Sequence, residues 1–285
     1  MKFLYNVVCV GAGGTGSFFL KEFARFMASY MARNFDKFIY LSIIDGDHVE
    51  KNNLERQAFI DSDINSNKAV TMTTAIKENF GLECVYAYPI YIDTVNQLEQ
   101  VYERLYEENQ KITRRSYECQ AIDILIGSAD NHRVRQVMHE FFYNHRKTIF
   151  YYDAANEYLN GEVVFAGRHE GKLLGQSRAD YFQEVLTDES PRASEISCGA
   201  VNKSTPQHIA TNMMAGNLLL SRLSMLIAEN KMEFGIAYFD AANLYVNFYP
   251  DKENQKKWRK EKRARKAKQD KAENTKPASQ SSNVY

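Results

Sequence analysis

Glycines at a spacing suited to phosphate binding stand close to the start of the chain. Gly11, Gly13 and Gly16 form the pattern G-x-G-x-x-G, and Gly14 adds a fourth glycine to the same turn. Glycines permit a tight turn and let a phosphate approach the backbone, and a following helix presents free N–H groups to that phosphate. The pattern alone fits ATP, NAD, FAD or S-adenosylmethionine, and a tight turn without a ligand is the other interpretation.

A polar segment follows the second apolar run of the chain. Residues 45–57 read DGDHVEKNNLERQ, and a lysine follows at position 68. Asp45 stands directly after the apolar run, where a carboxylate can bond the hydroxyls of a ribose. Dehydrogenases share such an acid, and an Asp that only caps a turn is the other interpretation. The candidate nucleotide-binding residues of this segment are Asp45, Asp47, Asn53, Arg56, Gln57 and Lys68.

A third polar segment comes after another apolar run and before a helical pattern. It reads SADN at 128–131 and is followed by Arg135. Asp130 and Asn131 are of types that commonly cap helices, so a plain helix cap is one interpretation of this segment. Its position after the two preceding motifs favours a role in the same site.

The segments that carry these motifs alternate between strand and helix. Strands are predicted at 3–10, 38–44, 83–90, 121–127 and 148–152, and helices at 17–35, 63–80, 94–109 and 133–145. Continuous apolar runs rich in β-branched and aromatic residues, such as Phe3–Val10, are typical of buried parallel strands. The alternation predicts an α/β fold with a Rossmann-like, doubly wound, mostly parallel sheet.

The second half of the chain departs from this alternation. A strand is predicted at 161–168, a polar irregular segment at 173–198, a long helix at 205–230 and an apolar strand pattern at 236–248. From Asp251 to Tyr285 the chain holds 12 Lys and Arg against 5 Asp and Glu, and few apolar residues. Such a segment cannot bury enough surface to fold alone. We expect one domain over 1–250 and a basic tail over 251–285 that is disordered or forms a lone helix.

Composition and charge exclude several classes of protein. The 285 residues hold 36 Lys and Arg and 36 Asp and Glu, so the whole chain has no net charge. Because the tail has 12 basic and 5 acidic residues, residues 1–250 carry a net charge of −7. Only the tail therefore weakly suggests nucleic acid as a partner. No apolar stretch reaches the roughly 18 residues of a membrane span, and the first apolar run ends in the glycine turn rather than in a signal-peptide cleavage site. A cytoplasmic location is therefore expected. None of the four cysteines forms a C-x-x-C pair, so we expect no structural zinc site.

In their shared order, the motifs resemble those of the ThiF/MoeB/E1 superfamily of ubiquitin-activating-like enzymes. Residues 45–57 are similar to its D-x-D-x-V-x-x-x-N-L-x-R-Q string, Lys68 and Ala69 to its Lys-Ala pair, and 130–135 to its D-N-x-x-x-R element. The likeness covers roughly residues 5–250 and is greatest with the shorter bacterial ThiF-type proteins, including those of PRTRC gene clusters. It implies that a crossover loop and extra C-terminal strands follow the parallel sheet.

The resemblance implies an ATP-dependent adenylyltransferase that uses Mg²⁺. ATP would lie on the glycine turn with its ribose at Asp45, while Arg56 and Lys68 would face the negative charge that builds on the triphosphate. Asp130 would help to hold Mg²⁺, and Asn131 would shape the site. The C-terminal carboxylate of a small ubiquitin-like protein or of a peptide would attack the α-phosphate, and pyrophosphate would leave.

The resemblance also bears on Cys198, which stands in a Ser-Cys-Gly string before the predicted long helix. Related enzymes carry a cysteine at this place that takes an acyl group or sulfur from the activated partner, and a thiolate near a helix start is activated. A thiol without chemistry is the other interpretation. Asn53 and Gln57 would orient the phosphates or the adjoining loop. A homodimer is expected from the family.

Three other functions remain open from the sequence. The same ATP site would serve a relative that modifies a peptide or a tRNA base, to which the basic tail gives slight support. A non-catalytic scaffold subunit is the second, although the intact Arg56, Lys68 and Asp130 argue against it. An NAD(P)-dependent dehydrogenase is the third; it would use the glycine turn and Asp45 but gives residues 53–57 no role.

Overall fold

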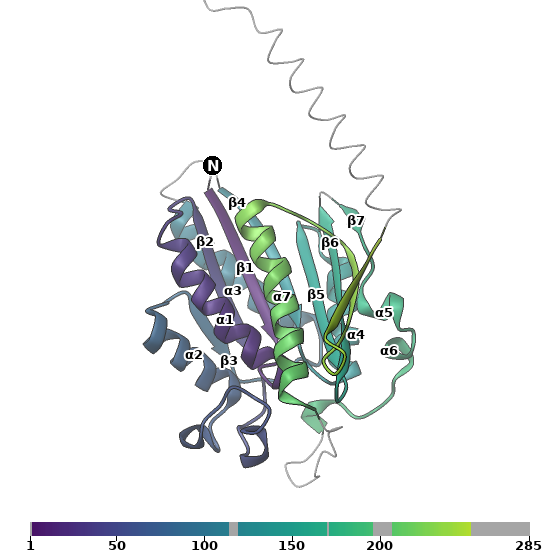
Figure 1. Cartoon of the computed structure of the whole chain (residues 1–285). Coiled ribbons are helices and arrows are strands. Elements are labelled where there is room, and N and C mark those ends of the chain that lie inside the picture. The colour runs from purple at the N-terminus through teal and green to yellow at the C-terminus, as the bar shows by residue number, and fades with distance from the viewer. Residues whose placement is uncertain (1, 114–118, 170, 196–206, 252–285) are drawn as a thin grey trace, which may run out of the picture.

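A single mixed sheet forms the centre of the computed structural model, which describes residues 2–113, 119–169, 171–195 and 207–251. The strands are β1 (Lys2–Val10), β2 (Lys37–Ile44), β3 (Val85–Tyr88), β4 (Cys119–Gly127), β5 (Ile149–Asn156), β6 (Asn160–His169), β7 (Lys172–Leu174), β8 (Gly235–Asp240) and β9 (Tyr245–Pro250). Their order is β3-β2-β1-β4-β5-β6-β8-β9, with β7 paired to β6. Strands β1 to β5 pair in parallel, whereas β6 to β9 join antiparallel (Figure 1).

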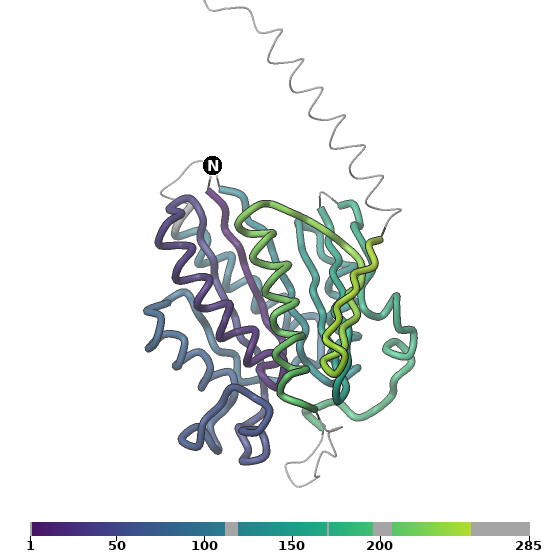
Figure 2. Tube along the Cα trace, viewed as in Figure 1, coloured from purple at the N-terminus to yellow at the C-terminus, as the bar shows by residue number. Residues whose placement is uncertain are grey.

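Helices cover both faces of this sheet. One face carries α1 (Gly14–Met31), α2 (Lys68–Phe80) and α7 (Ile209–Glu229), and the other carries α3 (Val95–Thr113) and α4 (His132–Asn144) (Figure 1). Although α1 and α7 are far apart in the sequence, they lie side by side across the sheet (Figure 2). The short helices α5 (Arg178–Tyr181) and α6 (Glu184–Thr187) and the 3₁₀ turns Lys51–Asn53, Asp61–Asp63 and Ala193–Glu195 lie in the connections.

The two faces explain why β1 reads as a continuous apolar run. Val7 and Cys9 belong to the core beneath α1 and α7, whereas Val8 and Val10 belong to the core beneath α3 and α4. Successive side chains of a strand point to opposite faces, so a strand that is covered on both sides must be apolar at every position. All four of these side chains are buried.

Strand register places the predicted site segments in one row. Val10 at the end of β1 pairs with Ile44 of β2 and with Gly127 of β4, and Gly127 pairs with Asp153 of β5. The residues that follow these strand ends therefore meet at the carboxyl edge of the sheet. The strand order reverses between β1 and β4, and in open α/β sheets ligands bind in the crevice at such a switch point.

The predicted α/β fold with its mostly parallel, doubly wound sheet and extra C-terminal strands is confirmed. Details differ where side-chain hydrogen bonds set the boundaries. The helix predicted from position 63 begins at Lys68, because the side chain of Asn67 accepts the N–H of Val70 and caps it. The pattern at 236–248 is the hairpin of β8 and β9, and the carboxylate of Asp240 accepts the N–H groups of Ala242 and Asn243 in its turn.

Other expectations concern the second half of the chain. The segment predicted as irregular over 173–198 contains β7, α5 and α6, and the part from 196 onward lies outside the described residues. The tail over 252–285 lies outside them as well, so the division into 1–250 and 251–285 stays a prediction. In the part of the chain that the structure describes, no helix combines the length and the apolar character that crossing a membrane requires.

Candidate nucleotide-binding site

Three of the four glycines in the turn after β1 have no room for a side chain, because other parts of the protein pack against them. Gly11 has a φ of +97°, and a Cβ added there would lie 2.9 Å from the backbone of Ser128 and Ala129. A Cβ on Gly16 would lie 2.1 Å from the carbonyl oxygen of Gly11, and one on Gly14 would lie 2.5 Å from the amide of Asn212. These glycines let the turn, the loop after β4 and α7 come into contact.

Gly13 differs from these glycines because the described residues leave space beside it. The nearest atom to an added Cβ would be Nε2 of Gln57, at 3.9 Å. Gly13 is the N-cap of the 18-residue helix α1 and makes no side-chain cap hydrogen bond. Gln57 is 5% exposed, and its Oε1 has no hydrogen-bond partner among the described residues. Free helix N–H groups and open space fit a phosphate, and the unsatisfied Oε1 of Gln57 can accept a hydrogen bond from a donor group of the same ligand.

The carboxylate of Asp45 is anchored to the glycine turn. Its Oδ2 accepts the N–H of Ala12 at 2.6 Å, and its Oδ1 accepts the N–H of Asp47 at 2.8 Å. Burial raises the pKa of Asp45 to about 6, against the opposing effect of the nearby Lys68 and of both N–H groups. Each carboxylate oxygen keeps a further lone pair, so Asp45 can still accept hydroxyl groups such as those of a ribose.

Lys68 places a buried positive charge at the same edge. Its side chain is 8% exposed, and its Nζ donates to Oδ2 of Asp47 at 3.0 Å. The hydroxyl of Tyr91 donates to Oδ1 of the same carboxylate at 2.7 Å. Burial lowers the pKa of Lys68, but the charges of Asp45, Asp47 and Asp130 outweigh it, so the pKa is raised and the ammonium is retained at neutral pH.

A loop between β2 and α2 carries Arg56 and Gln57. The buried Asn53 organises this loop: its side-chain oxygen accepts a backbone N–H at 3.0 Å, and its carbonyl accepts the N–H groups of Arg56 and Gln57. The N–H of Ala58 donates to Oγ of Ser17 in α1 at 3.0 Å and docks the loop beside the glycine turn. Asn53 therefore shapes the loop, while Arg56 and Gln57 lie closer to the turn.

The loop after β4 crosses the glycine turn and presents Asp130. Oγ of Ser128 donates to the carbonyl of Gly11 at 2.7 Å, which fixes the contact between the two segments. Asp130 is exposed, and its charge acts on Lys68. Oδ1 of Asn131 accepts the N–H of Arg133 at 2.7 Å, so Asn131 caps α4 as the sequence predicts. Carboxylate oxygens are ligands that Mg²⁺ accepts, so the predicted role of Asp130 is compatible with its exposure.

Of the buried charges beneath this loop, Arg135 belongs to the predicted D-N-x-x-x-R element, whereas Asp153 and Arg178 were not recognised from the sequence. Asp153 is fully buried at the end of β5 and lies 3.2 Å from Nε of Arg178 and 3.7 Å from Nε of Arg135. Arg178 also donates to Glu162 at 2.6 Å, and Arg135 donates to the carbonyl of Ala129 at 2.8 Å. The cluster supports the loop that carries Asp130. Nothing local in the sequence marks Arg178 as a partner of Asp153.

Two cysteines of the described part of the chain, Cys9 and Cys84, are poor candidates for a nucleophile. Burial raises the pKa of Cys9 to about 12 and that of Cys84 to about 11, so neither forms a thiolate readily at neutral pH. Cys198 lies outside the described residues, and its role stays a prediction.

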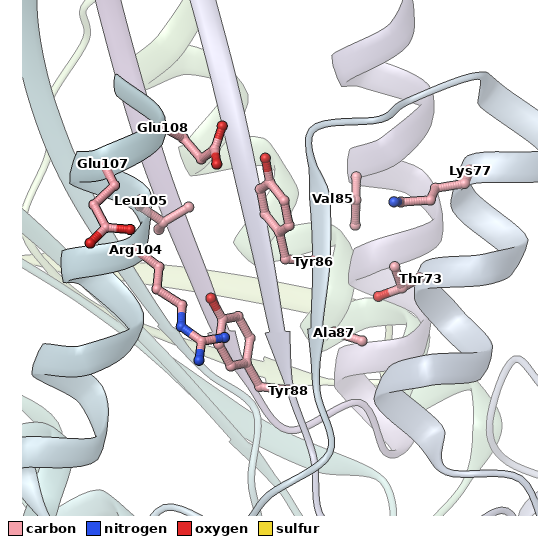
Figure 3. Close-up of a pocket in the computed structure, with 10 residues that line it drawn as sticks. All are labelled: Thr73, Lys77, Val85, Tyr86, Ala87, Tyr88, Arg104, Leu105, Glu107 and Glu108. Carbon is pink, nitrogen blue, oxygen red and sulfur yellow. The ribbon is translucent and has the colours of Figure 1, made fainter. Parts of the chain in front are cut away.

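A cleft of about 400 Å³ lies apart from the glycine turn, along the edge strand β3 (Figure 3). Its walls include Thr73 and Lys77 of α2, Tyr86 and Tyr88 of β3, and Arg104 and Glu108 of α3. The cleft meets the candidate site at Tyr88, whose carbonyl accepts the N–H of Asp45 at 3.1 Å. None of the site residues predicted from the sequence lines it.

Comparisons with known proteins agree with this fold. A family model described as ThiF family matches residues 3–258. Three similar solved structures are PaaA (14% identity, TM-score 0.56), Escherichia coli MccB with MccA-N7isoASN (15%, 0.57) and E. coli MccB with ATP (15%, 0.55). Each match covers 86% of this chain but only 63%, 64% and 62%, respectively, of the other, so the chain spans less than two thirds of their length. No curated protein matches the sequence.

Proposed function

Because the chain belongs to the ThiF family, we propose that it binds ATP and Mg²⁺ at the glycine turn and adenylates the C-terminal carboxylate of a peptide or of a small ubiquitin-like protein. The observation that carries the proposal is Gly13. It is the glycine of the turn whose missing side chain leaves open space, and it stands at the uncapped start of α1. The carboxylate of Asp45 binds the neighbouring N–H of Ala12, and its charge acts on the cation of Lys68.

Each site residue has a role in this reaction. The N–H groups at the start of α1 bind phosphate oxygens, and Asp45 accepts ribose hydroxyls. Arg56 and Lys68 stabilise the negative charge that grows on the phosphates as the reaction proceeds. Asp130 would hold Mg²⁺, which when bound neutralises triphosphate oxygens. Gln57 accepts one further hydrogen bond at the turn through its unsatisfied Oε1.

The chemical step is an in-line displacement at the α-phosphorus of ATP. A carboxylate oxygen of the acceptor forms the new P–O bond, and the bridging oxygen leaves with its electron pair as pyrophosphate. Little covalent chemistry falls to the protein, whose task is to hold the two reactants in line and to stabilise charge. The product is an acyl adenylate.

The acceptor class rests on the family and on what its structural neighbours were solved with. E. coli MccB was solved with ATP and with MccA. We propose a peptide or protein carboxyl terminus as the acceptor for this chain on that basis. We further propose a homodimer, which size-exclusion chromatography with light scattering would test directly.

Binding of ATP is the first test. Isothermal calorimetry with MgATP should give a measurable Kd for the wild-type chain. Arg56→Ala and Lys68→Ala should each weaken binding by roughly tenfold or more, because charge-assisted hydrogen bonds are stronger than those between neutral groups. Arg25→Ala is the matched control, since Arg25 is exposed on α1 and its side chain is 66% accessible. A wild-type chain that binds no MgATP would refute the proposal.

Adenylation itself is tested by ATP–pyrophosphate exchange with small proteins encoded beside this one. Exchange that needs one such protein, that disappears when its last residue is deleted and that is lost in Arg56→Ala would identify the acceptor. Exchange that persists unchanged after deletion of that residue would contradict attack by the C-terminal carboxylate.

A further inference from the structure

The start of α7 contacts Arg56 through two side chains. Oε1 of Gln207 accepts a hydrogen bond from Nη1 of Arg56 at 3.1 Å. Nδ2 of Asn212 donates to the backbone carbonyl of Arg56 at 2.9 Å. Both the side chain and the backbone of Arg56 are therefore held by one short stretch of the chain, more than 150 residues away in the sequence.

Asn212 also contacts the glycine turn. It is fully buried, and its amide occupies the space that a Cβ on Gly14 would need, at 2.5 Å. Its Oδ1 accepts a hydrogen bond from Nδ2 of Asn156 at 2.9 Å, and Oδ1 of Asn156 accepts the hydroxyl of Thr15 at 2.9 Å. The chain of amides joins α1, β5 and α7 to the Arg56 loop.

We propose that Gln207 and Asn212 are positioning residues that hold Arg56 in place against the glycine turn. The inference rests on the proposed function, because it assigns these residues to the clamp around the phosphates of ATP. Asn212 sets the distance between the Arg56 backbone and the first turn of α1. Gln207 restricts the guanidinium of Arg56, a half-buried residue, by accepting its hydrogen bond.

Restricting Arg56 before the nucleotide arrives lowers the entropic cost of binding. A long side chain such as arginine loses rotamer freedom when it engages a ligand, and a side chain that is already ordered loses less. The benefit of Gln207 therefore exists only while Arg56 is present. This dependence separates a positioning role from a contribution to folding alone, which would persist without Arg56.

A double-mutant cycle measures that dependence. Gln207→Ala should weaken MgATP binding by roughly three- to tenfold in the wild-type background, the effect of one hydrogen bond. In the Arg56→Ala background the same change should have less than roughly a twofold effect, because the two residues act as one unit. Equal losses in both backgrounds would overturn the role of Gln207.

Asn212→Asp tests the anchoring without any nucleotide. The carboxylate still accepts from Asn156 but cannot donate to the Arg56 carbonyl, so amide hydrogen exchange at Gln57 and Ala58 should become faster. Asn217→Asp is the matched control, because Asn217 is exposed on the same helix. Unchanged exchange at 57–58 in Asn212→Asp would overturn the inference, whereas failure of the wild-type chain to bind MgATP counts against the proposed function alone.

Discussion

Asp45 accepts a hydrogen bond from the backbone N–H of Ala12 at 2.6 Å, and this contact joins the carboxyl end of β2 to the glycine turn after β1. The bond orients the turn and holds the half-buried carboxyl group of Asp45 beside it. Burial raises the pKa of Asp45 to about 6, so its protonation changes within an accessible pH range.

The raised pKa of Asp45 predicts a pH-dependent stability with a definite sign. The folded chain binds the Asp45 proton more tightly than the unfolded chain, so this group stabilises the fold at low pH and loses that contribution as the pH rises through about 6. As the pH rises from 4 to 7, the free energy of unfolding of Asp45→Asn should therefore increase by on the order of 1 kcal/mol relative to that of the wild type.

Urea unfolding of both proteins at several pH values measures this difference. The pKa of Asp47 is lowered and contributes with the opposite sign, but Asp47 is present in both proteins. Asp61→Asn, on an exposed 3₁₀ turn, serves as a matched control. If the free energy of unfolding of Asp45→Asn instead increases relative to the wild type as the pH falls, the raised pKa of Asp45 is contradicted.

The two glycines at positions 13 and 16 should respond differently to alanine. Gly13→Ala should keep the free energy of unfolding within about 1 kcal/mol, because the added Cβ meets no close atom of the described residues, yet weaken MgATP binding by roughly tenfold or more. Gly16→Ala should cost about 2 kcal/mol or more, since its Cβ would lie 2.1 Å from the Gly11 carbonyl. Thermal unfolding and calorimetry separate the two; equal destabilisation would argue against an open ligand position at Gly13.

Asp130 should matter for catalysis and not for folding. The residue is exposed, so Asp130→Asn should leave the melting temperature close to that of the wild type. Pyrophosphate exchange should fall by roughly 100-fold, and half-maximal exchange should require more Mg²⁺, because a carboxylate that holds the ion is lost. A variant with an unchanged Mg²⁺ requirement would remove Asp130 from the ion site.

Arg178 should be among the residues on which folding depends most. Arg178→Met leaves the fully buried Asp153 short of a partner and should cost about 3–5 kcal/mol in free energy of unfolding. Arg25→Met removes an exposed ion pair with Glu22 and should cost less than about 1 kcal/mol. If Arg178→Met with Asp153→Asn is no more stable than Arg178→Met alone, the loss comes from packing and not from the unpaired charge.

Cys198 should form a thioester if the acyl group passes from the adenylate to the protein. The thiolate would attack the acyl carbon, and AMP would leave with the electron pair of the broken C–O bond. A species sensitive to reducing agent should appear with ATP and the acceptor, and Cys198→Ala should abolish it without affecting pyrophosphate exchange. Cys84→Ala is a suitable control because burial raises the pKa of its thiol to about 11. Persistence of the species in Cys198→Ala would assign it to another residue.

The sequence by itself determined the strands and helices of the parallel part of the sheet. Nearly continuous apolar runs in β1 and β2 require cover on both faces, which parallel strands between helices provide, and the alternation with helical periods implied the α/β fold. The order of the motifs also placed the glycine turn, Asp45 and Asp130 at strand ends, because the ends of parallel strands share one edge. These features are local, so neighbouring residues carry the signal.

Only the tertiary structure decided which side chains meet across that edge. The contacts of Arg56 with Gln207, of Gly14 with Asn212 and of Asp153 with Arg178 join residues that no local pattern links. Likewise, the four glycines look alike in the sequence, and only the packing of the β4 loop and of α7 leaves Gly13 open. Hydrogen bonds and ion pairs between polar side chains depend on distance and direction in space, and a periodic pattern along one chain segment contains neither.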